Sequence, residues 1–275
     1  MIEIKNLSKT FGKVRALDDI SLVIEPGIHG LLGPNGSGKT TLFRCLTRII
    51  EPDSGEINVP AKISYLPQKF GFYKSMQVVD VMKYFALLKK IPSTDAVREI
   101  DELLAKVNLS TERKKRVGQL SGGMLRRLGI ALSLQGNPDL LLVDEPTVGL
   151  DPEERLNFKQ LLMDVGRQRS IVISTHIVND VEALCDKIII LHKGKVVAHD
   201  TQAGIAGFAR GKVYNIAVAD KDRLVEPYHV TQRFFDGEVE YLHLLSNQRQ
   251  AAIEKAPGIE DGYLLYIREA EQGGQ

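Results

Sequence analysis

The sequence lacks the features that mark membrane-spanning and disulfide-stabilised proteins. No apolar run approaches the ~20 residues that a membrane-spanning helix needs, so any membrane spans would belong to another chain. The 275 residues contain only two cysteines, Cys45 and Cys185, which lie far apart without metal-ligand spacing. This usage predicts buried free thiols and a reducing cytosol. Residues 1–5 alternate as a strand does and do not resemble a signal peptide.

The chain also lacks a strong charge of either sign. Its net charge is +1, whereas proteins that coat nucleic acids usually carry a large basic excess, so we expect no nucleic-acid partner. The charged fraction of 26% and the hydrophobic fraction of 43% are ordinary for a globular protein. The length of 275 residues predicts about two domains, with a core large enough to need no metal or disulfide.

The stretch from residue 33 to residue 41 fits the phosphate-binding pattern G-x-x-x-x-G-K-[ST]. Its residues are Gly33, Pro34, Asn35, Gly36, Ser37, Gly38, Lys39, Thr40 and Thr41. An apolar run at 28–32 predicts a buried strand before it, and apolar spacing predicts a helix at 40–50 after it. The alternative, a glycine-rich turn that only ends a strand, does not account for both flanking elements.

A polyphosphate carries several negative charges, and this stretch offers matching groups. Its glycines let backbone N–H groups approach phosphate oxygens, and the N-terminus of the following helix adds partial positive charge. Lys39 supplies a full charge for the outer phosphates. The Thr40 hydroxyl suits a magnesium ion, which prefers oxygen ligands. These residues therefore predict a site for a polyphosphate with magnesium.

Two further apolar runs, at 140–143 and 171–174, show no alternation and predict parallel strands buried on both faces. The first ends in Asp144 and Glu145, and the second is followed by His176. The carboxyl ends of such strands face the ligand crevice of α/β folds. Magnesium and a polarised water would compensate two buried carboxylates. If the strands are neighbours, His176 lies beside these acids on the catalytic side.

The remaining pattern predicts short strands over 1–26, a strand pair at 56–59 and 63–66, and a hairpin at 188–191 and 195–198. A helical insertion is expected from about residue 70, with helices at 76–89, 95–107 and up to 134, the last capped by Ser121. Asp151 is expected to cap another helix, and the basic run 113–116 to be a solvated helix end. In the tail, strands are predicted at 213–218, 239–244 and 263–267, and a short helix at 250–255.

Phe11 sits in a turn and has two interpretations. It either stacks on a nucleobase or packs as a core or edge aromatic, and its spacing leaves both open.

In their order along the chain, these motifs resemble the nucleotide-binding subunit of the ATP-binding cassette family over about residues 1–205. The resemblance is carried by the phosphate-binding stretch, Gln68, the loop Leu120-Ser121-Gly122-Gly123, Asp144-Glu145, Gly149-Leu150-Asp151 and His176. It implies an α/β fold with a P-loop NTPase core of the RecA type and an antiparallel β subdomain. The ATPase domain would span 1–210, with a helical subdomain at about 70–135, and a small α+β appendage would span 211–275.

The resemblance also implies a role for each matching residue. Residues 35–41 would cradle the phosphates of ATP, with Lys39 acting on their charge, and Phe11 would stack on adenine. Thr40 and Asp144 would hold Mg²⁺, and Gln68 would touch both Mg²⁺ and the attacking water. Glu145 would be the general base, and His176 would contact the terminal phosphate.

The loop Ser121, Gly122 and Gly123 would bind the ATP held by the opposite subunit. The working unit would then be a head-to-tail dimer of two ATPase subunits, expected to be a homodimer, with two ATP molecules between them. Met124 departs from the Gln or Glu that usually ends this loop, and we expect activity to survive with weaker closure.

The resemblance favours an ATPase subunit that drives transport through a separate transmembrane permease, from the inner face of the cell membrane. Residues 69–75 and the helix after them would meet the permease, and the ending at 258–265 favours export. The alternative is a soluble cassette ATPase that acts on a cytosolic protein or nucleic-acid assembly. Such proteins often carry two cassettes or long coiled coils, which this sequence lacks. A regulatory ATP sensor is disfavoured because both Glu145 and His176 are present.

Overall fold

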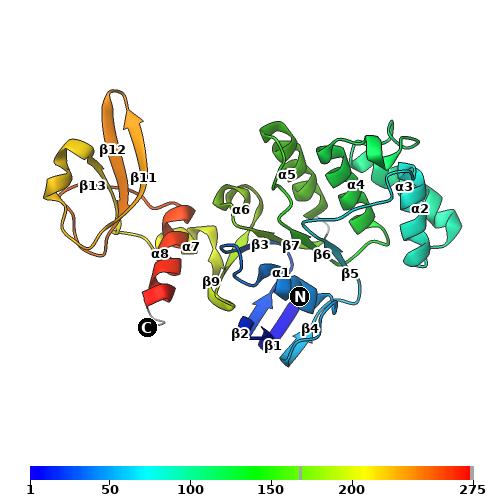
Figure 1. The fold of residues 1–275 in the computed structure, drawn as a ribbon, viewed down its shortest axis with the longest axis horizontal. Coiled ribbons are helices and arrows are strands. Elements are labelled where there is room, and N and C mark those ends of the chain that lie inside the picture. Colours follow the sequence, from blue (N-terminus) through cyan, green and yellow to red (C-terminus); the bar gives the residue numbers. More distant parts are fainter. Residues whose placement is uncertain (167–168, 273–275) are drawn as a thin grey trace.

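The computed structural model describes residues 1–166 and 169–272. Within these residues the core is a mainly parallel sheet, with a small antiparallel sheet on one side and helices on the other (Figure 1). The core sheet runs in the order β5-β6-β7-β3-β8-β9, and only its last strand is antiparallel to its neighbour among the described pairings. The strands are β3 (Ile28–Leu32), β5 (Ile63–Leu66), β6 (Leu140–Asp144), β7 (Ser170–Thr175), β8 (Lys187–His192) and β9 (Lys195–Thr201).

The central strands form because their side chains are apolar on both faces. In β6, Leu140 and Leu142 pack into the core under the antiparallel sheet, whereas Leu141 and Val143 pack into the core under the helices. β6 pairs in parallel with β7, and β7 pairs in parallel with β3. The buried parallel strands predicted at 140–143 and 171–174 are therefore confirmed, and they are neighbours.

The antiparallel sheet covers one face of the core sheet. It consists of β1 (Ile2–Phe11), β2 (Val14–Ile24) and β4 (Ser54–Asn58), in the order β2-β1-β4. Helix α1 (Lys39–Leu46) fills the space between the two sheets with Leu42, Phe43 and Leu46. This helix is shorter than the predicted 40–50, because the chain leaves helical geometry at Arg48, whose φ is 55°.

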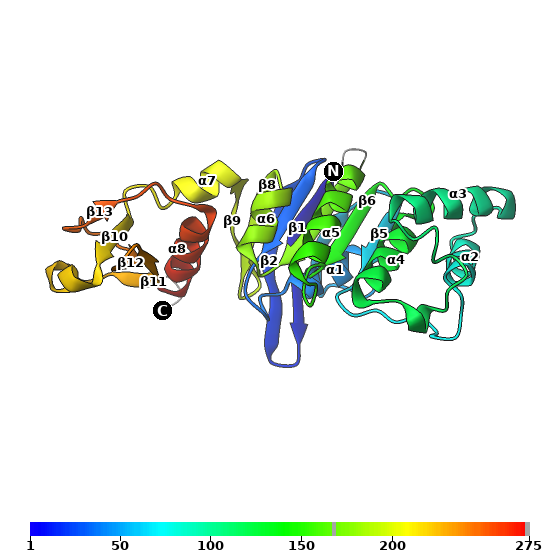
Figure 2. The same cartoon turned by 90° about the horizontal axis from the view of Figure 1, so that it is seen from above.

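Three helices cover the opposite face, and in both views they follow one another along the sheet (Figure 1, Figure 2). They are α4 (Gly122–Leu134), α5 (Pro152–Gly166) and α6 (Val178–Leu184). Both predicted caps are confirmed. The Ser121 hydroxyl accepts a hydrogen bond from Met124 N at 3.1 Å, and Asp151 Oδ1 accepts one from Glu154 N at 2.8 Å.

Between β5 and α4 the chain leaves the sheet and forms a helical extension (Figure 2). Its elements are α2 (Val78–Leu88), α3 (Ser93–Lys106) and the 3₁₀ turn η1 (Val117–Gln119). The helices predicted at 76–89 and 95–107 are confirmed. The basic run 113–116 is not a helix end, since it lies in turns well beyond the end of α3.

The C-terminal part begins with α7 (Gln202–Gly207) and continues as a small antiparallel sheet in the order β11-β12-β10-β13. Its elements are β10 (Val213–Ala217), the 3₁₀ turn η2 (Val218–Arg223), β11 (His229–Asp236), β12 (Val239–Leu245), β13 (Ile253–Glu254) and α8 (Ile259–Gln272). Helix α8 returns to α7, where the rings of Phe208 and Tyr266 stack with centroids 3.8 Å apart.

Three expectations about pairing and tail structure are wrong. Residues 56–59 and 63–66 do not pair with each other, because β4 joins β1 and β5 joins β6. Residues 263–267 lie inside α8 and not in a strand, since Tyr263, Tyr266 and Ile267 recur at helical spacing and pack together on the core. Residues 250–255 contain β13, which pairs with β10, and not a helix. Strand β11 was not predicted, because its exposed polar residues weaken the alternation.

Two absences in the sequence have direct structural counterparts. Across residues 1–166 and 169–272, no helix combines the length and apolarity needed to cross a membrane. Cys45 and Cys185 are buried free thiols, as predicted. Burial raises the pKa of the Cys45 thiol to about 11, so both geometry and acidity keep it unreactive.

The close contact between α7 and α8 leads to a first testable prediction. A Cβ at Gly262 would overlap the backbone carbonyl of Ile205, which cannot rotate away as a side chain can. We expect Gly262→Ala to lower the free energy of unfolding by about 1–3 kcal/mol, measured by urea denaturation. Gly207→Ala is the matched control, because a Cβ there meets nothing within 4 Å. Equal stability of the two variants would contradict the close packing of α8.

Candidate functional site

The phosphate-binding stretch leaves β3 and enters α1 through a tightly packed loop. Gly38 has a φ of 110°, a conformation that residues with a side chain rarely adopt. A Cβ there would overlap the carbonyl of Ala16, and one at Gly33 would overlap the carbonyl of Leu191. The turn between β8 and β9 holds the loop in place, because Gly194 N donates to Ser37 O at 2.9 Å.

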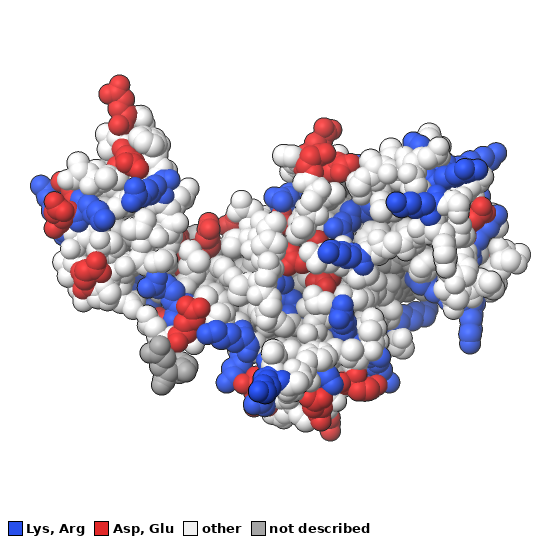
Figure 3. Space-filling view, in the orientation of Figure 1, with Lys and Arg blue, Asp and Glu red and all other residues white. Residues whose placement is uncertain are grey.

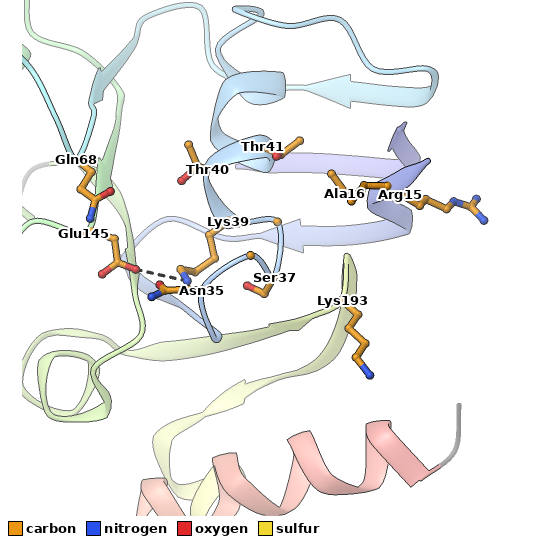
Figure 4. A pocket seen from close by; sticks show the side chains of 13 residues that line it. Arg15, Ala16, Asn35, Ser37, Lys39, Thr40, Thr41, Gln68, Glu145 and Lys193 are labelled. Carbon is orange, nitrogen blue, oxygen red and sulfur yellow. Dashed lines mark ion pairs between the residues drawn. The ribbon is translucent and has the colours of Figure 1, made fainter. Parts of the chain in front are cut away.

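This loop forms one wall of a cavity of about 490 Å³ (Figure 4). Val14, Arg15, Ala16, Asn35, Gly36, Ser37, Gly38, Lys39, Thr40, Thr41, Gln68, Glu145 and Lys193 line the cavity. The sequence had singled out the loop residues, Gln68 and Glu145. It gave no sign of Val14, Arg15, Ala16 or Lys193, which reach the cavity only because β2 and the β8–β9 turn pack beside the loop.

Lys39 lies deep in the site, with an exposed fraction of 5%. Its Nζ donates to the carbonyls of Gly33 at 2.7 Å and Pro34 at 3.1 Å. The same atom lies 3.4 Å from Glu145 Oε1 (Figure 4). Burial lowers the pKa of Lys39, while the carboxylates of Glu145 and Asp144 oppose that shift. The ammonium is therefore stabilised by the groups around it.

Asp144 ends β6 and is almost fully buried, with an exposed fraction of 1%. Its Oδ2 accepts hydrogen bonds from Thr40 Oγ1 at 2.8 Å and from the Tyr65 hydroxyl at 3.1 Å. Its Oδ1 accepts one from the Ser174 hydroxyl. Burial, and next the Asp144 charge, raise the pKa of Tyr65, which therefore stays a donor. A hydroxyl oxygen and a carboxylate oxygen thus meet from two elements, which is the donor chemistry that Mg²⁺ prefers.

Glu145 and His176 lie side by side at the carboxyl ends of β6 and β7. His176 Nδ1 is 2.8 Å from Glu145 Oε2, while the other carboxylate oxygen faces Lys39. Glu145 has a φ of 46°, which is uncommon for a residue with a side chain. Its backbone N donates to Ser174 O at 3.0 Å. The strand register therefore brings the acid and the imidazole together, as the sequence analysis expected.

The loop Ser121, Gly122 and Gly123 does not line this cavity. Gly122 is exposed, and a Cβ there would meet nothing within 4 Å. Further along α4, Arg126 donates to the carbonyls of Gln68 at 3.0 Å and Val148 at 3.3 Å. The helix that begins at this loop thus anchors both Gln68 and the segment that follows Glu145.

Phe11 lies at the end of β1 with an exposed fraction of 48%. Lys9 Nζ sits 5.6 Å from the ring centroid and is held by Asp53 at 2.7 Å. The ring does not line the cavity and is not part of the core. Core packing is therefore wrong, and two interpretations remain, an aromatic at the sheet edge and a ring that stacks on a nucleobase.

Comparisons with known proteins identify the family. The ABC transporter family model matches residues 17–148. An uncharacterised ABC transporter ATP-binding protein of Methanocaldococcus jannaschii is 38% identical over 198 residues, which cover 71% of this chain and 76% of that protein. The Nod factor export ATP-binding protein I of Burkholderia lata is 33% identical over 211 residues, covering 72% and 69%.

A solved structure gives the same answer at the level of the fold. A dimeric ATP-binding cassette in a post-hydrolysis state, bound to ADP and inorganic phosphate, matches with a TM-score of 0.65 and 25% identity. The match covers 73% of this chain and 98% of that one. The chain belongs to the ABC transporter family as an ATP-binding subunit, with the cassette fold and an ATPase activity.

The second prediction follows from the close packing around Gly38. We expect Gly38→Ala to weaken ATP binding at least about tenfold, or 1.4 kcal/mol, because the loop must open to relieve the clash with Ala16. Titration of a fluorescent ATP analogue measures the change. Gly71→Ala is the control, since a Cβ at that exposed position meets nothing within 4 Å. Native affinity in Gly38→Ala would show that the loop conformation is not required.

Proposed function

We propose that this chain binds ATP with Mg²⁺ and hydrolyses it at the described cavity to drive export through a separate permease. The observation that carries the proposal is the convergence of Lys39 and His176 on the Glu145 carboxylate, beside a phosphate-binding loop. A charged donor for phosphate, a base and a group that orients the base are what phosphoryl transfer to water requires of a protein.

Thr40 and Asp144 are the proposed holders of Mg²⁺, with Gln68 at the cavity wall. The ion would neutralise charge on the outer phosphates. Thr40 and Asp144 fit Mg²⁺ because a hydroxyl oxygen and a buried carboxylate oxygen already lie 2.8 Å apart there. Ser174 and Tyr65 hold the Asp144 carboxylate from its other sides, so that its orientation does not depend on the ion.

The other residues act on ATP and water. The backbone N–H groups of residues 33–41 would cradle the phosphates, and Lys39 would exchange the Gly33 and Pro34 carbonyls for phosphate oxygens. Glu145 would take the proton of the attacking water, which Gln68 helps to position. His176 would orient Glu145 through Nδ1 and contact the terminal phosphate. Phe11, exposed at the sheet edge, would stack on adenine.

As an ABC cassette, the chain works as a dimer together with a permease. We propose a homodimer in which Ser121, Gly122 and Gly123 bind the ATP of the partner subunit. Two observations support this arrangement. The loop does not line its own cavity, and the backbone at Gly122 is exposed at a helix start. Gly123 is buried against the Glu154 carboxylate, which would have to move for a phosphate to reach that residue.

The proposed permease contact is the stretch 69–75 with α2. Apolar side chains are exposed there, including Tyr73 at 76% and Leu87 at 73%, which is typical of an interaction surface. Residues 70–135 carry 12 Lys and Arg against 6 Asp and Glu, and Figure 3 shows blue side chains over this end of the molecule. A basic end suits a peripheral position on the anionic inner face of the cell membrane.

Export is proposed because a relative of this chain is named for Nod factor export. We also propose the domain division 1–210 and 211–275, with a helical subdomain at about 70–135. The compact antiparallel sheet of β10 to β13 supports a separate appendage, although α8 packs back on the ATPase domain through α7.

The role of Glu145 makes the third prediction. We expect Glu145→Gln to lose hydrolysis while retaining ATP, because the amide keeps the shape of the side chain but cannot accept the proton. With ATP and magnesium it should accumulate as a dimer, seen by size-exclusion chromatography with light scattering. Lys39→Ala is the control and should remain monomeric, because it lacks the charge that binds the outer phosphates. A Glu145→Gln chain that stays monomeric with ATP would count heavily against the proposal.

The fourth prediction concerns the proposed contact with a permease. A tagged chain purified from its native cells in mild detergent should bring down a polytopic membrane protein, identified by mass spectrometry. The matched variant Leu87→Glu places a charge on the exposed apolar surface of α2 and should lose that protein while keeping ATP binding. Recovery of soluble partners alone, with the chain absent from membranes, would reject the permease proposal and leave the ATP site intact.

A further inference from the structure

A second cross-link joins the two segments that carry Glu145 and His176. The Thr147 hydroxyl donates a hydrogen bond to Asp180 Oδ2. Both residues are almost inaccessible, with exposed fractions of 0% for Thr147 and 2% for Asp180. Thr147 lies two residues beyond Glu145, and Asp180 lies four residues beyond His176. The segments that follow β6 and β7 are therefore tied twice, once by the reacting pair and once behind it.

A third element reaches the same carboxylate. Lys159 of α5 places its Nζ 2.9 Å from Asp180 Oδ1 and donates to the Asn179 carbonyl at 3.0 Å. The loop after β6, helix α5 and helix α6 thus meet at one buried charge. Because a buried charge that loses its partners is strongly unfavourable, these three elements are expected to hold one another in a single arrangement.

The unusual backbone conformation of Glu145 needs support from its surroundings, and this arrangement supplies part of it. Its φ of 46° is a conformation that persists only when the surroundings fix it. On the strand side, Ser174 fixes it by accepting the hydrogen bond of Glu145 N at 3.0 Å. On the other side the chain continues through Pro146 to Thr147, whose hydroxyl is the next side-chain anchor. Arg126 holds the same segment one residue further on, at the Val148 carbonyl, so the Thr147 hydroxyl is the side-chain anchor nearest to Glu145 on this side.

We propose that Thr147 and Asp180 are positioning residues that set the Glu145–His176 geometry, with Lys159 fixing Asp180. The proposal rests on the proposed function, since it assumes that Glu145 and His176 act on the water and the terminal phosphate. It assigns no contact with ATP to Thr147 or Asp180, neither of which lines the cavity. The residues proposed to cradle the phosphates sit on the β3–α1 loop, which packs against Ala16 and is held by the β8–β9 turn, so we expect their positions to depend less on this cross-link than those of Glu145 and His176.

The proposal predicts that a change at Thr147 lowers kcat for ATP hydrolysis and leaves KM unchanged. Thr147→Val keeps the side-chain shape and removes the hydroxyl, so the segment after Glu145 is free to relax. We expect kcat for ATP to fall about tenfold or more, as misplaced reacting groups cause, while KM and the affinity for an ATP analogue stay within about twofold. Thr147→Ser restores the hydroxyl, and its kcat should return to within about twofold of the native chain.

Asp180→Ala, which removes the acceptor of the Thr147 hydroxyl, gives an independent second measurement if Thr147→Val folds poorly. The two changes should act as one unit, so the double variant should lose no more kcat than the worse single variant. Ser133→Ala is the matched control, because its buried hydroxyl donates to the Ile130 carbonyl at 2.8 Å within α4 and the residue does not line the cavity. Its kcat should equal the native value even if its stability falls as much.

The outcomes separate this proposal from the one on which it rests. Native kcat in Thr147→Val or Asp180→Ala, parallel changes in kcat and KM, or failure of Thr147→Ser to restore the rate would each overturn the positioning role. An equal loss of kcat in Ser133→Ala would do the same, because it would assign the effect to stability. If instead Glu145→Gln hydrolyses ATP as fast as the native chain, the proposed function itself fails.

Discussion

The parallel pairing of β6 with β7 is the constraint on which the candidate site depends. Its register sets Asp144 opposite Ser174, so the segments beyond these strands leave the same edge of the sheet together. Glu145 then meets His176 at 2.8 Å, and behind that pair Thr147 meets Asp180. Because a shift of one residue would turn every side chain to the other face, the chemistry at this edge depends on the buried apolar residues that fix the register.

Burial and pairing of charge explain why the site keeps one shape. Lys39, Asp144 and Glu145 all have exposed fractions of 5% or less, and an isolated charge at such a depth would cost several kcal/mol. Each is instead satisfied by a neighbour, since Lys39 contacts Glu145 and loop carbonyls while Asp144 accepts three hydroxyls. In the proposed function, a triphosphate with its cation would enter a site whose groups are already oriented, and it would exchange contacts instead of creating them.

The sequence located the elements that meet at this cavity because each of them carries a strong local signal. Apolar runs without alternation located β6 and β7, and the glycine pattern located the loop between β3 and α1. Choices of strand partner carry no such signal, and β4 and β5 were wrongly paired for that reason. Val14 and Lys193 reach the cavity only through packing between sheets. In the tail, the short apolar run at 263–267 fits either a strand or a helix, and only packing against α7 decides for the helix.

The C-terminal appendage is joined to the cavity by a continuous path of contacts. Glu271, near the end of α8, lies 3.8 Å from His192 at the end of β8. Burial lowers the pKa of His192, although Glu271 opposes that shift. The next residue, Lys193, lines the cavity, and Gly194 donates to the Ser37 carbonyl of the phosphate-binding loop at 2.9 Å. A boundary at residue 210 therefore divides the sequence but not the packing, because α8 contacts the strand that leads into the turn supporting the loop.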